Sequence, residues 1–319
     1  RHQYKFFLKE LNMGKNTIYH FRSYAKMNWF LKIGQIRQDG YHDIVSIMQI
    51  IDLYDMIDIS SSESHSDEIQ CNYDIPTGKR SLLGRLLNLL REYDSQLKDR
   101  YFSIKIKKNI PPASGLGGAS SNVAKILKMI NTIFQLSLDT EKLIEISSKL
   151  GSDIPFFASG YPFAVISGKG EKVIPLNHPP KRELVLVFPK LGIDTSWAYQ
   201  EWDIYRQRQG SLPVPSMEEF LRHFHSKSIE SFIWNDFEEV VFSHYPELKL
   251  YKKQLEQLGC TQVFMTGSGS TVVGIAPDHE RAIDICKKLY QEGINSLWSS
   301  TITEYNDDVI ECSREGEEG

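Results

Sequence analysis

Residues 110–124 read IPPASGLGGASSNVA: two prolines, a glycine- and serine-rich stretch, and then apolar residues at helical spacing. Val123, Ile126, Leu127 and Ile130 recur on one face, which predicts a buried helix directly after the glycines. The N-terminus of a helix attracts anions because its first N–H groups have no intrahelical partner. Glycine also lets a backbone approach an anion closely. The stretch therefore predicts either a phosphate-binding loop or a tight strand-to-helix turn with serine caps.

The glycine-rich stretch alone does not decide between these two alternatives. No Gly-Lys-Ser or Gly-Lys-Thr follows the glycines, so this is not the common P-loop, and it is not the dinucleotide fingerprint. Ser120 and Ser121 would add hydroxyl donors to a phosphate or reach a phosphate-bound Mg²⁺. The remaining motifs of the chain have to settle the question.

Composition narrows the class of protein. The chain has 319 residues, 41% hydrophobic and 24% charged, which is typical of a globular protein of two domains or one large domain. A formal net charge of -4 argues against a nucleic-acid or polybasic membrane partner. No apolar run approaches the roughly 18 residues needed to cross a bilayer. The cysteines are far apart without metal or disulfide spacing, so we expect a reducing cytoplasm: Cys71, Cys260, Cys286 and Cys312.

Strand and helix patterns alternate along most of the chain, which favours an α+β protein with two packed lobes. The proline-rich, charged segment 178–183 is the expected boundary between the lobes. Residues 1–21 and 306–319 are expected to be flexible extensions. We expect strands within 30–34, 46–60, 101–110, 163–176, 183–190, 261–276 and 294–305, and helices within 80–93, 118–134, 139–150, 214–224, 246–259 and 278–293.

Further motifs flank the glycine loop in a fixed order: SYAKMNWFLKIG (23–34), DGYH (39–42), GSDIPFF (151–157), NDFEEVVFSHYPEL (235–248) and MTGSGSTVVG (265–274). Together with the loop they resemble the galactokinase–homoserine kinase–mevalonate kinase (GHMP) superfamily. Within it, the 4-diphosphocytidyl-2-C-methyl-D-erythritol kinase family is the most similar. The resemblance covers about residues 22–305. Tyr24, Val123 and Thr266 depart from the usual proline, alanine and serine, and residues 60–79 and 200–230 match poorly.

The resemblance implies a fold and a reaction. It implies a ribosomal-S5-like N-terminal domain over 22–178, a ferredoxin-like C-terminal domain over 183–305, and an active site in the cleft between them. The implied reaction is transfer of the ATP γ-phosphate to the 2-hydroxyl of a diphosphocytidyl sugar alcohol, within the non-mevalonate route to isoprenoid precursors. ATP and Mg²⁺ would be the cofactors, and the implied protein is a cytoplasmic monomer or weak homodimer. No carboxylate ligand of Mg²⁺ is evident from the motifs, so phosphates with Ser120 or Ser121 would hold the ion.

Site roles follow residue by residue from the matched motifs. Asp153 would be the general base, and Lys26 would pair with it and steady developing charge. Asn28 would bind the substrate, Tyr41 and Tyr199 would stack on cytosine, and His42 would hydrogen-bond it, with Asp153 also touching the acceptor. The ATP contacts would be Lys108, Pro111, Gly115, Leu116, Gly117, Gly118, Ala119, Ser120 and Ser121.

Plainer interpretations of single residues remain at this point. Asp153 alone reads as a helix cap, Lys26 as a solvent-facing strand residue, Tyr199 as a packed helix residue, and Lys108 as an exposed strand end. Two other functions also compete. One is a homoserine or mevalonate-type kinase, which would not need the Tyr41-His42 pair. The other is a catalytically inactive nucleotide-binding module, against which the presence of both Lys26 and Asp153 argues.

Overall fold

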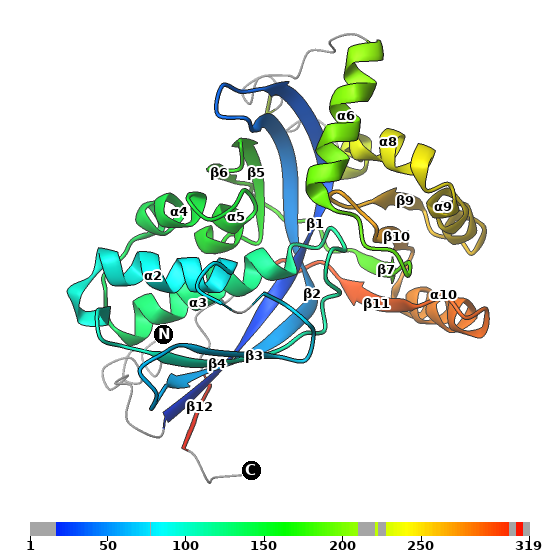
Figure 1. Ribbon diagram of the computed structural model, residues 1–319. Helices are drawn as coiled ribbons and strands as arrows, with labels where there is room; N and C mark the ends of the chain where they lie inside the picture. Colours follow the sequence, from blue (N-terminus) through cyan, green and yellow to red (C-terminus); the bar gives the residue numbers. More distant parts are fainter. Residues whose placement is uncertain (1–16, 77, 210–220, 223–227, 306–310, 315–319) are drawn as a thin grey trace.

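The structure is a computed structural model that describes residues 17–76, 78–209, 221–222, 228–305 and 311–314. Two sheets organise the chain (Figure 1). The larger sheet has the strand order β12-β1-β2-β4-β3, with β5 paired to β2 and β6, and β8 paired to β1. The smaller sheet has the order β11-β7-β10-β9. The expected mixed α+β organisation in two lobes is confirmed.

A long hairpin forms the spine of the molecule. Strands β1 (Thr17–Ile36) and β2 (His42–Ser61) pair antiparallel along their length, with register shifts that bend the ribbon. The turn contains Gly40 at φ +83°, a conformation that favours glycine. The hairpin extends through both lobes in Figure 1. Side chains on it can therefore meet residues from either lobe.

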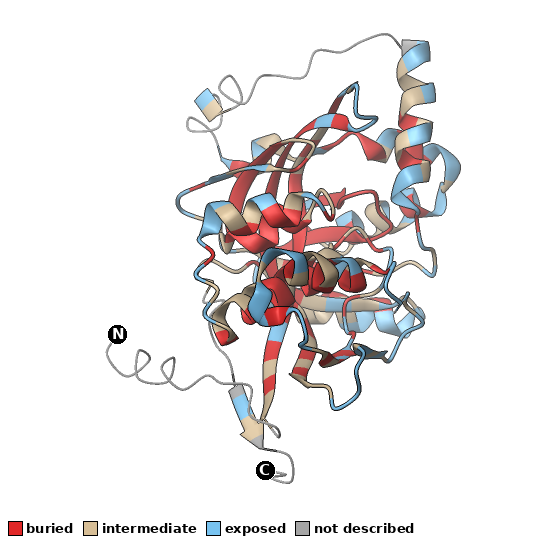
Figure 2. Ribbon diagram, turned by 60° about the vertical axis from the view of Figure 1, so that its left-hand side comes forward, coloured by how far each residue is buried: buried red, intermediate tan, exposed pale blue. Residues whose placement is uncertain are grey.

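The first lobe packs helices onto one face of the larger sheet. These helices are α2 (Leu82–Tyr93), α3 (Gly118–Ile133), α4 (Thr140–Ser148) and α5 (Ile154–Ser159). The 3₁₀ turn η2 (Ser95–Leu97) follows α2, and the other strands are β3 (Glu68–Cys71), β4 (Phe102–Lys107), β5 (Phe163–Gly168) and β6 (Lys172–Pro175). Buried apolar residues follow the inner helix faces and the sheet (Figure 2). Helix α3 places its N-terminus at the glycine loop.

The second lobe covers its four-stranded sheet with two amphipathic helices. Strands β7 (Glu183–Val187), β9 (Gln262–Met265), β10 (Val272–Ala276) and β11 (Ser296–Ser300) pack against α9 (Glu247–Gln257) and α10 (His279–Gln291). The N-cap Asp278 accepts a hydrogen bond from the Arg281 N–H, which fixes the start of α10. Helices α6 (Thr195–Gln209) and α8 (Phe237–His244), with η3 (Ile229–Phe232) and β8 (Trp234–Asn235), lie between this sheet and the hairpin.

Most of the predicted strands and helices are confirmed, with two corrections. The expected helix at 214–224 lies almost wholly outside the described residues, and helices α5, α6 and α8 were not anticipated. The ends assigned as flexible extensions are partly ordered in the larger sheet, because Glu311–Arg314 forms β12 and pairs with the start of β1 at Thr17. Tyr19 and Phe21 pack in the first lobe's core, only 1% and 3% exposed, which explains why these residues belong to the domain.

Candidate active site

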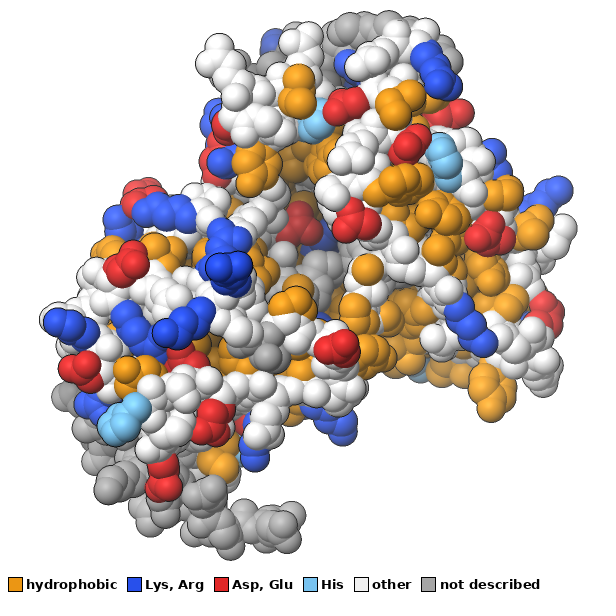
Figure 3. All heavy atoms as spheres, viewed as in Figure 1, with side chains coloured by type: hydrophobic (Ala, Val, Ile, Leu, Met, Phe, Trp, Pro, Cys, Tyr) orange, Lys and Arg blue, Asp and Glu red, His pale blue; other side chains and the backbone are white. Residues whose placement is uncertain are grey.

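A cavity of about 640 Å³ lies where the glycine loop, the hairpin and the second lobe meet. The space-filling view shows the surface hollowed between the two lobes (Figure 3). One part of the wall is polar and includes Lys26, Asn28 and Asp153. Another part is apolar, and the residues there are Ile75, Pro76, Leu82, Leu83 and Ile106. The glycine loop also lines the cavity, from Pro111 to Gly118 with the exception of Leu116.

Two glycine turns, one from each lobe, touch backbone to backbone. Gly115 has φ +78°, and a Cβ there would lie 2.2 Å from the Thr266 carbonyl oxygen. Gly267 has φ +57°, and a Cβ there would lie 2.7 Å from the Gly115 carbonyl oxygen. The Thr271 N–H donates to the Ser114 carbonyl at 3.2 Å. Only glycine allows this approach, so the loop is fixed against the second lobe at this point.

Lys26 lies at the centre of the polar wall. Its side chain is 3% exposed, and its ammonium donates to Asn28 Oδ1 at 2.6 Å and to the Gly115 carbonyl at 3.0 Å. The Asp153 carboxylate lies 3.4 Å from the same ammonium. Asn28 is itself held, because its side-chain amide donates to Ser46 Oγ at 2.8 Å. This buried lysine is therefore not the solvent-facing strand residue of the plainer interpretation.

Asp153 occupies the N-cap position of α5 but does not cap it. Its side chain makes no capping hydrogen bond and is 31% exposed, so its oxygens are open to the cavity. Pro155 in the first turn has no N–H that would need a cap. The structure thus presents a carboxylate and an ammonium side by side, in front of the N-terminus of α3. A hydroxyl bound here would meet a proton acceptor and a positive charge at once.

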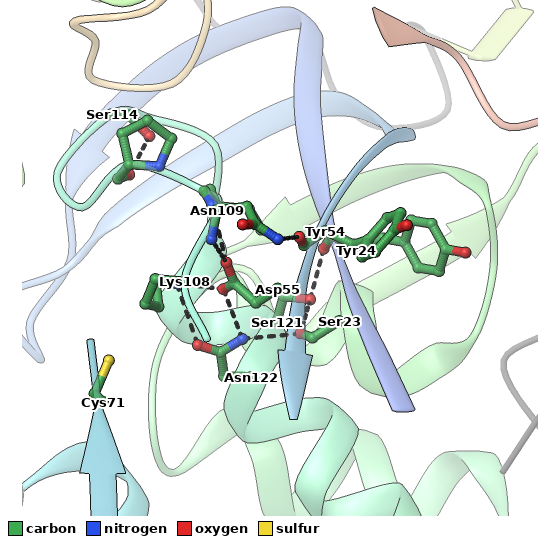
Figure 4. A network of polar contacts seen from close by, with 12 residues as sticks. Ser23, Tyr24, Tyr54, Asp55, Cys71, Lys108, Asn109, Ser114, Ser121 and Asn122 are labelled. Carbon is green, nitrogen blue, oxygen red and sulfur yellow. Dashed lines mark hydrogen bonds and ion pairs between the residues drawn. The ribbon is translucent and has the colours of Figure 1, made fainter. Parts of the chain in front are cut away.

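Of the predicted ATP contacts, all except Leu116 and Ser121 line the cavity. Leu116 is fully buried, and its carbonyl accepts from the Lys26 N–H at 3.0 Å. The Ser121 hydroxyl donates to the Tyr24 carbonyl at 2.6 Å and contacts Ser23 Oγ at 2.7 Å. Lys108 lines the wall, but its ammonium is paired with Asp55 behind the loop (Figure 4). Sequence reasoning placed these side chains in the right segment but did not foresee their buried partners.

The predicted cytosine contacts are only partly brought together. The His42 ring stacks on Tyr199 with centroids 4.9 Å apart and an angle of 15°. His42 Nε2 lies 2.8 Å from Asp203 Oδ1. Burial, and then the charge of Asp153, raises the pKa of Tyr199, so its phenol stays neutral. Tyr41 is 51% exposed in the hairpin turn and lines a separate cavity of about 140 Å³.

Three supporting residues of the site were not predicted. Thr266 Oγ1 accepts from the Asn28 N–H at 2.9 Å, and the Asn235 amide donates to the Met265 and Gly267 carbonyls, both at 2.8 Å. Both residues lie within the quoted motifs, which was the available signal. No sequence signal pointed to Asp55, because the segment around it carries several aspartates and only the fold shows which one is buried.

The oxygen donors of the cavity fit a magnesium ion held mainly by phosphates. Within the described residues no group of three or more His, Cys, Asp or Glu side chains forms a metal cluster. The Ser120 hydroxyl lies on the cavity wall, whereas the Ser121 hydroxyl is engaged with Tyr24. Magnesium commonly takes one or two protein ligands beside waters and phosphate oxygens.

Comparison with known proteins identifies the family of the chain. Residues 81–161 match the GHMP kinases N terminal domain, and residues 217–295 match the GHMP kinases C terminal domain. The chain is 36% identical over 258 residues to a 4-diphosphocytidyl-2-C-methyl-D-erythritol kinase of Thermodesulfovibrio yellowstonii, covering 80% of this chain and 88% of the relative. It is 36% identical over 270 residues to the enzyme of that name from Geotalea daltonii, covering 84% and 93%.

Solved structures agree as well. A crystal structure of 4-(cytidine 5'-diphospho)-2C-methyl-D-erythritol kinase superposes with a TM-score of 0.70 at 27% identity, covering 88% of this chain and 98% of that one. The mevalonate kinase of L. major reaches a TM-score of 0.63 at 15% identity, covering 90% and 97%, which shows the shared fold alone. The sequence motifs, the two-lobed fold and these relatives agree: the chain belongs to the 4-diphosphocytidyl-2-C-methyl-D-erythritol kinase family of the GHMP kinases.

Proposed function

We propose that the protein transfers the γ-phosphate of ATP to the 2-hydroxyl of 4-diphosphocytidyl-2-C-methyl-D-erythritol, giving the 2-phosphate and ADP. The observation that carries the proposal is the pairing of Asp153 with Lys26 at 3.4 Å, beside the glycine loop in the main cavity. Phosphoryl transfer needs positioning and charge stabilisation more than covalent help from the protein. This cavity has residues suited to both tasks.

The chemistry assigned to the chain's own residues is simple. Asp153 accepts the proton of the substrate hydroxyl while the hydroxyl oxygen attacks the γ-phosphorus. The bond between the γ-phosphorus and the oxygen that bridges to the β-phosphate breaks, and ADP leaves. Lys26 orients Asp153 through their ion pair at 3.4 Å and stabilises charge on the transferred group. Backbone N–H groups of the loop from Gly115 to Ser120 bind the phosphates at the start of α3. Magnesium, held with the phosphates by Ser120, would supply further neutralisation of phosphate charge.

The two parts of the cavity suggest how ATP lies in it. The phosphates would follow the glycine loop, while the adenine would pack in the apolar part near Ile75, Pro76 and Leu83. The acceptor hydroxyl would then lie beside Asn28 and Asp153. Lys108 remains a proposed neighbour of the nucleotide, although its ammonium is paired with Asp55.

The cytidyl end of the substrate would bind near the hairpin turn. Tyr199 offers a neutral ring on the cavity wall, and His42 stacks behind it. Tyr41 would have to pack against the base from the exposed turn, where Lys169 Nζ lies 4.6 Å from its ring centroid. Aromatic rings suit this task because they offer large, rigid contact surfaces.

We also propose a cytoplasmic location and a monomer or weak homodimer. The free state of all four cysteines supports a reducing compartment. Within the described residues, no helix is both long and apolar enough to cross a membrane.

The test is ADP release from Mg·ATP with the diphosphocytidyl substrate, measured beside mevalonate and homoserine at equal concentrations. We expect turnover with the diphosphocytidyl compound and at most background with the other two alcohols. Tight binding of Mg·ATP with no turnover on the diphosphocytidyl compound would overturn the proposed acceptor. Phosphorylation of homoserine or mevalonate in its place would reassign the protein within the superfamily.

A further inference from the structure

A single buried carboxylate joins the two ends of the glycine loop. Asp55 on β2 is fully buried, and its Oδ1 accepts from the Asn109 N–H at 2.8 Å and the Ile110 N–H at 2.9 Å. Its Oδ2 accepts from the Asn122 amide at 2.9 Å and from the Lys108 ammonium. Figure 4 shows Asp55 between the strand that leads into the loop and the helix that leaves it. One side chain therefore fixes both the entry and the exit of the loop.

The network continues from Asn122 into the hairpin. The Asn122 amide also donates to Ser23 Oγ at 3.1 Å, and Asn122 Oδ1 accepts from the Lys108 ammonium at 3.2 Å. Ser23 Oγ in turn contacts Ser121 Oγ at 2.7 Å. The first turn of α3 is thus tied to β1 and β2 by polar contacts, and two residues of this network, Lys108 and Asn122, also line the cavity. Buried networks with satisfied donors and acceptors hold a single geometry.

Charge is balanced within the network. A lone carboxylate behind a phosphate-binding loop would repel the phosphates, but the ion pair of Asp55 with Lys108 cancels its charge. All partners of the Asp55 carboxylate are hydrogen-bond donors, and its two oxygens accept from all of them. An amide in its place would turn a donor toward the Lys108 ammonium or the Asn122 amide.

We propose that Asp55 is a positioning residue for ATP: it holds the loop between Ile110 and Gly118 and the N-terminus of α3 in the phosphate-binding arrangement, with Lys108 acting through it. The role of Asp55 in positioning ATP rests on the proposed kinase function, but it does not depend on the identity of the acceptor. It also revises the expectation for Lys108. The ammonium supports the loop from behind and does not act as a separate phosphate ligand.

The experiment compares Asp55→Asn with a matched control, Asp67→Asn. Asp67 also pairs with a cation, Arg91, at 2.6 Å, and accepts from a backbone N–H, that of Phe102, at 3.1 Å, but it touches neither the loop nor the cavity. For each variant we would measure the Kd of Mg·ADP by calorimetry, the KM for ATP, the KM for the acceptor, kcat and the apparent Tm. The Mg·ADP binding measurement contains no acceptor substrate, so its result does not depend on which alcohol the protein phosphorylates.

We expect Asp55→Asn to weaken Mg·ADP binding and raise the KM for ATP by about tenfold, and to lower kcat by about tenfold or more, because misplaced reacting groups lose rate steeply. The KM for the acceptor should change by less than about twofold. Asp67→Asn should lower the Tm with unchanged nucleotide binding. In the double variant Asp55→Asn/Lys108→Met, nucleotide binding should be no weaker than in Asp55→Asn alone, since the two side chains act as one unit.

A milder variant keeps the test decisive if Asp55→Asn does not fold. Asn122→Ala removes the contacts of α3 with Asp55, Ser23 and Lys108 but leaves the Asp55–Lys108 pair, and it should shift nucleotide binding in the same direction by several-fold. Unchanged Mg·ADP binding in folded Asp55→Asn, or in folded Asn122→Ala where Asp55→Asn does not fold, would overturn the proposal. Tighter binding in Asp55→Asn would overturn it too, since it would mean that a freed Lys108 binds phosphate directly. If the wild-type protein bound Mg·ADP but phosphorylated another alcohol, only the proposed acceptor would fail.

Discussion

Asp153 illustrates how a residue can be placed for chemistry instead of stability. A carboxylate that caps a helix N-terminus is worth about 1 kcal/mol, yet the Asp153 side chain makes no such bond. It faces the Lys26 ammonium and the cavity instead. Asp139, which begins the neighbouring helix α4, does cap: it accepts from the Lys142 N–H. The two aspartates thus give a matched pair, one catalytic in our proposal and one structural.

Substitution of this pair separates the two roles. Asp153→Asn should lower kcat by about 10²- to 10⁴-fold, the usual contribution of a general base, with little change in Tm or in Mg·ADP affinity. Asp139→Ala should instead cost about 1 kcal/mol of unfolding free energy and leave kcat unchanged. Steady-state kinetics and urea unfolding measure both. An Asp153→Asn protein with a tenth or more of wild-type kcat would show that another group takes the proton.

Among the elements, the glycine loop shows what the sequence predicts and what it leaves out. Helical periodicity after the glycines correctly predicted α3, because that signal is local. The contact of Gly115 with Thr266 and the pairing of Lys108 with Asp55 join residues far apart in the chain, so no local pattern reveals them. Helix α6 was missed for another reason: TSWAYQEWDIYRQRQ carries aromatic and charged residues without a continuous apolar stripe. The motifs nevertheless named most residues of the cavity wall.

The contact between the two glycine turns predicts an effect of Gly115→Ala. The new Cβ would fall 2.2 Å from the Thr266 carbonyl at a residue with φ +78°, so the turns must separate. We expect a loss of about 1–3 kcal/mol in unfolding free energy and a loss of most Mg·ADP binding, measured by urea unfolding and calorimetry. Gly293→Ala is the control: it has φ +75° but nothing within 4 Å. It should cost about 1 kcal/mol and leave nucleotide binding intact. Equal nucleotide affinity in both variants would contradict a role for the contact.

At the scale of the whole molecule, the two lobes share polar contacts as well as apolar ones. The Asn28 N–H of the hairpin donates to Thr266 of the second lobe, and Gln49 on β2 donates to the Pro180 carbonyl in the connecting segment at 2.9 Å. The Trp29 indole N–H donates to the same Gln49 side chain at 2.7 Å. Since these buried groups find their partners across the junction, unfolding one lobe would leave polar groups of the other without partners. We therefore expect the lobes to unfold together.

Alkaline pH should destabilise the molecule through its buried acids. Burial raises the pKa of Cys260 to about 12, and burial also raises the pKa of Cys286 and of Tyr19. The folded protein therefore keeps protons that the unfolded chain releases from about pH 9 upward. The stabilisation is complete below the unfolded pKa and is lost as pH rises toward the folded pKa, so the unfolding free energy should fall between pH 8.5 and 10.5. Urea unfolding across this range measures the slope.

Cys260→Ala tests which group carries that slope. The variant should be about 1 kcal/mol less stable than wild type at pH 7, because a buried side chain is shortened, yet lose less stability as the pH rises. Cys71→Ala, on β3 of the other lobe, is the control and should keep the wild-type slope. A Cys260→Ala slope as steep as that of wild type would assign the alkaline loss to groups other than this thiol. Parallel curves for all three proteins would leave Cys286 and Tyr19 as the groups that carry the slope.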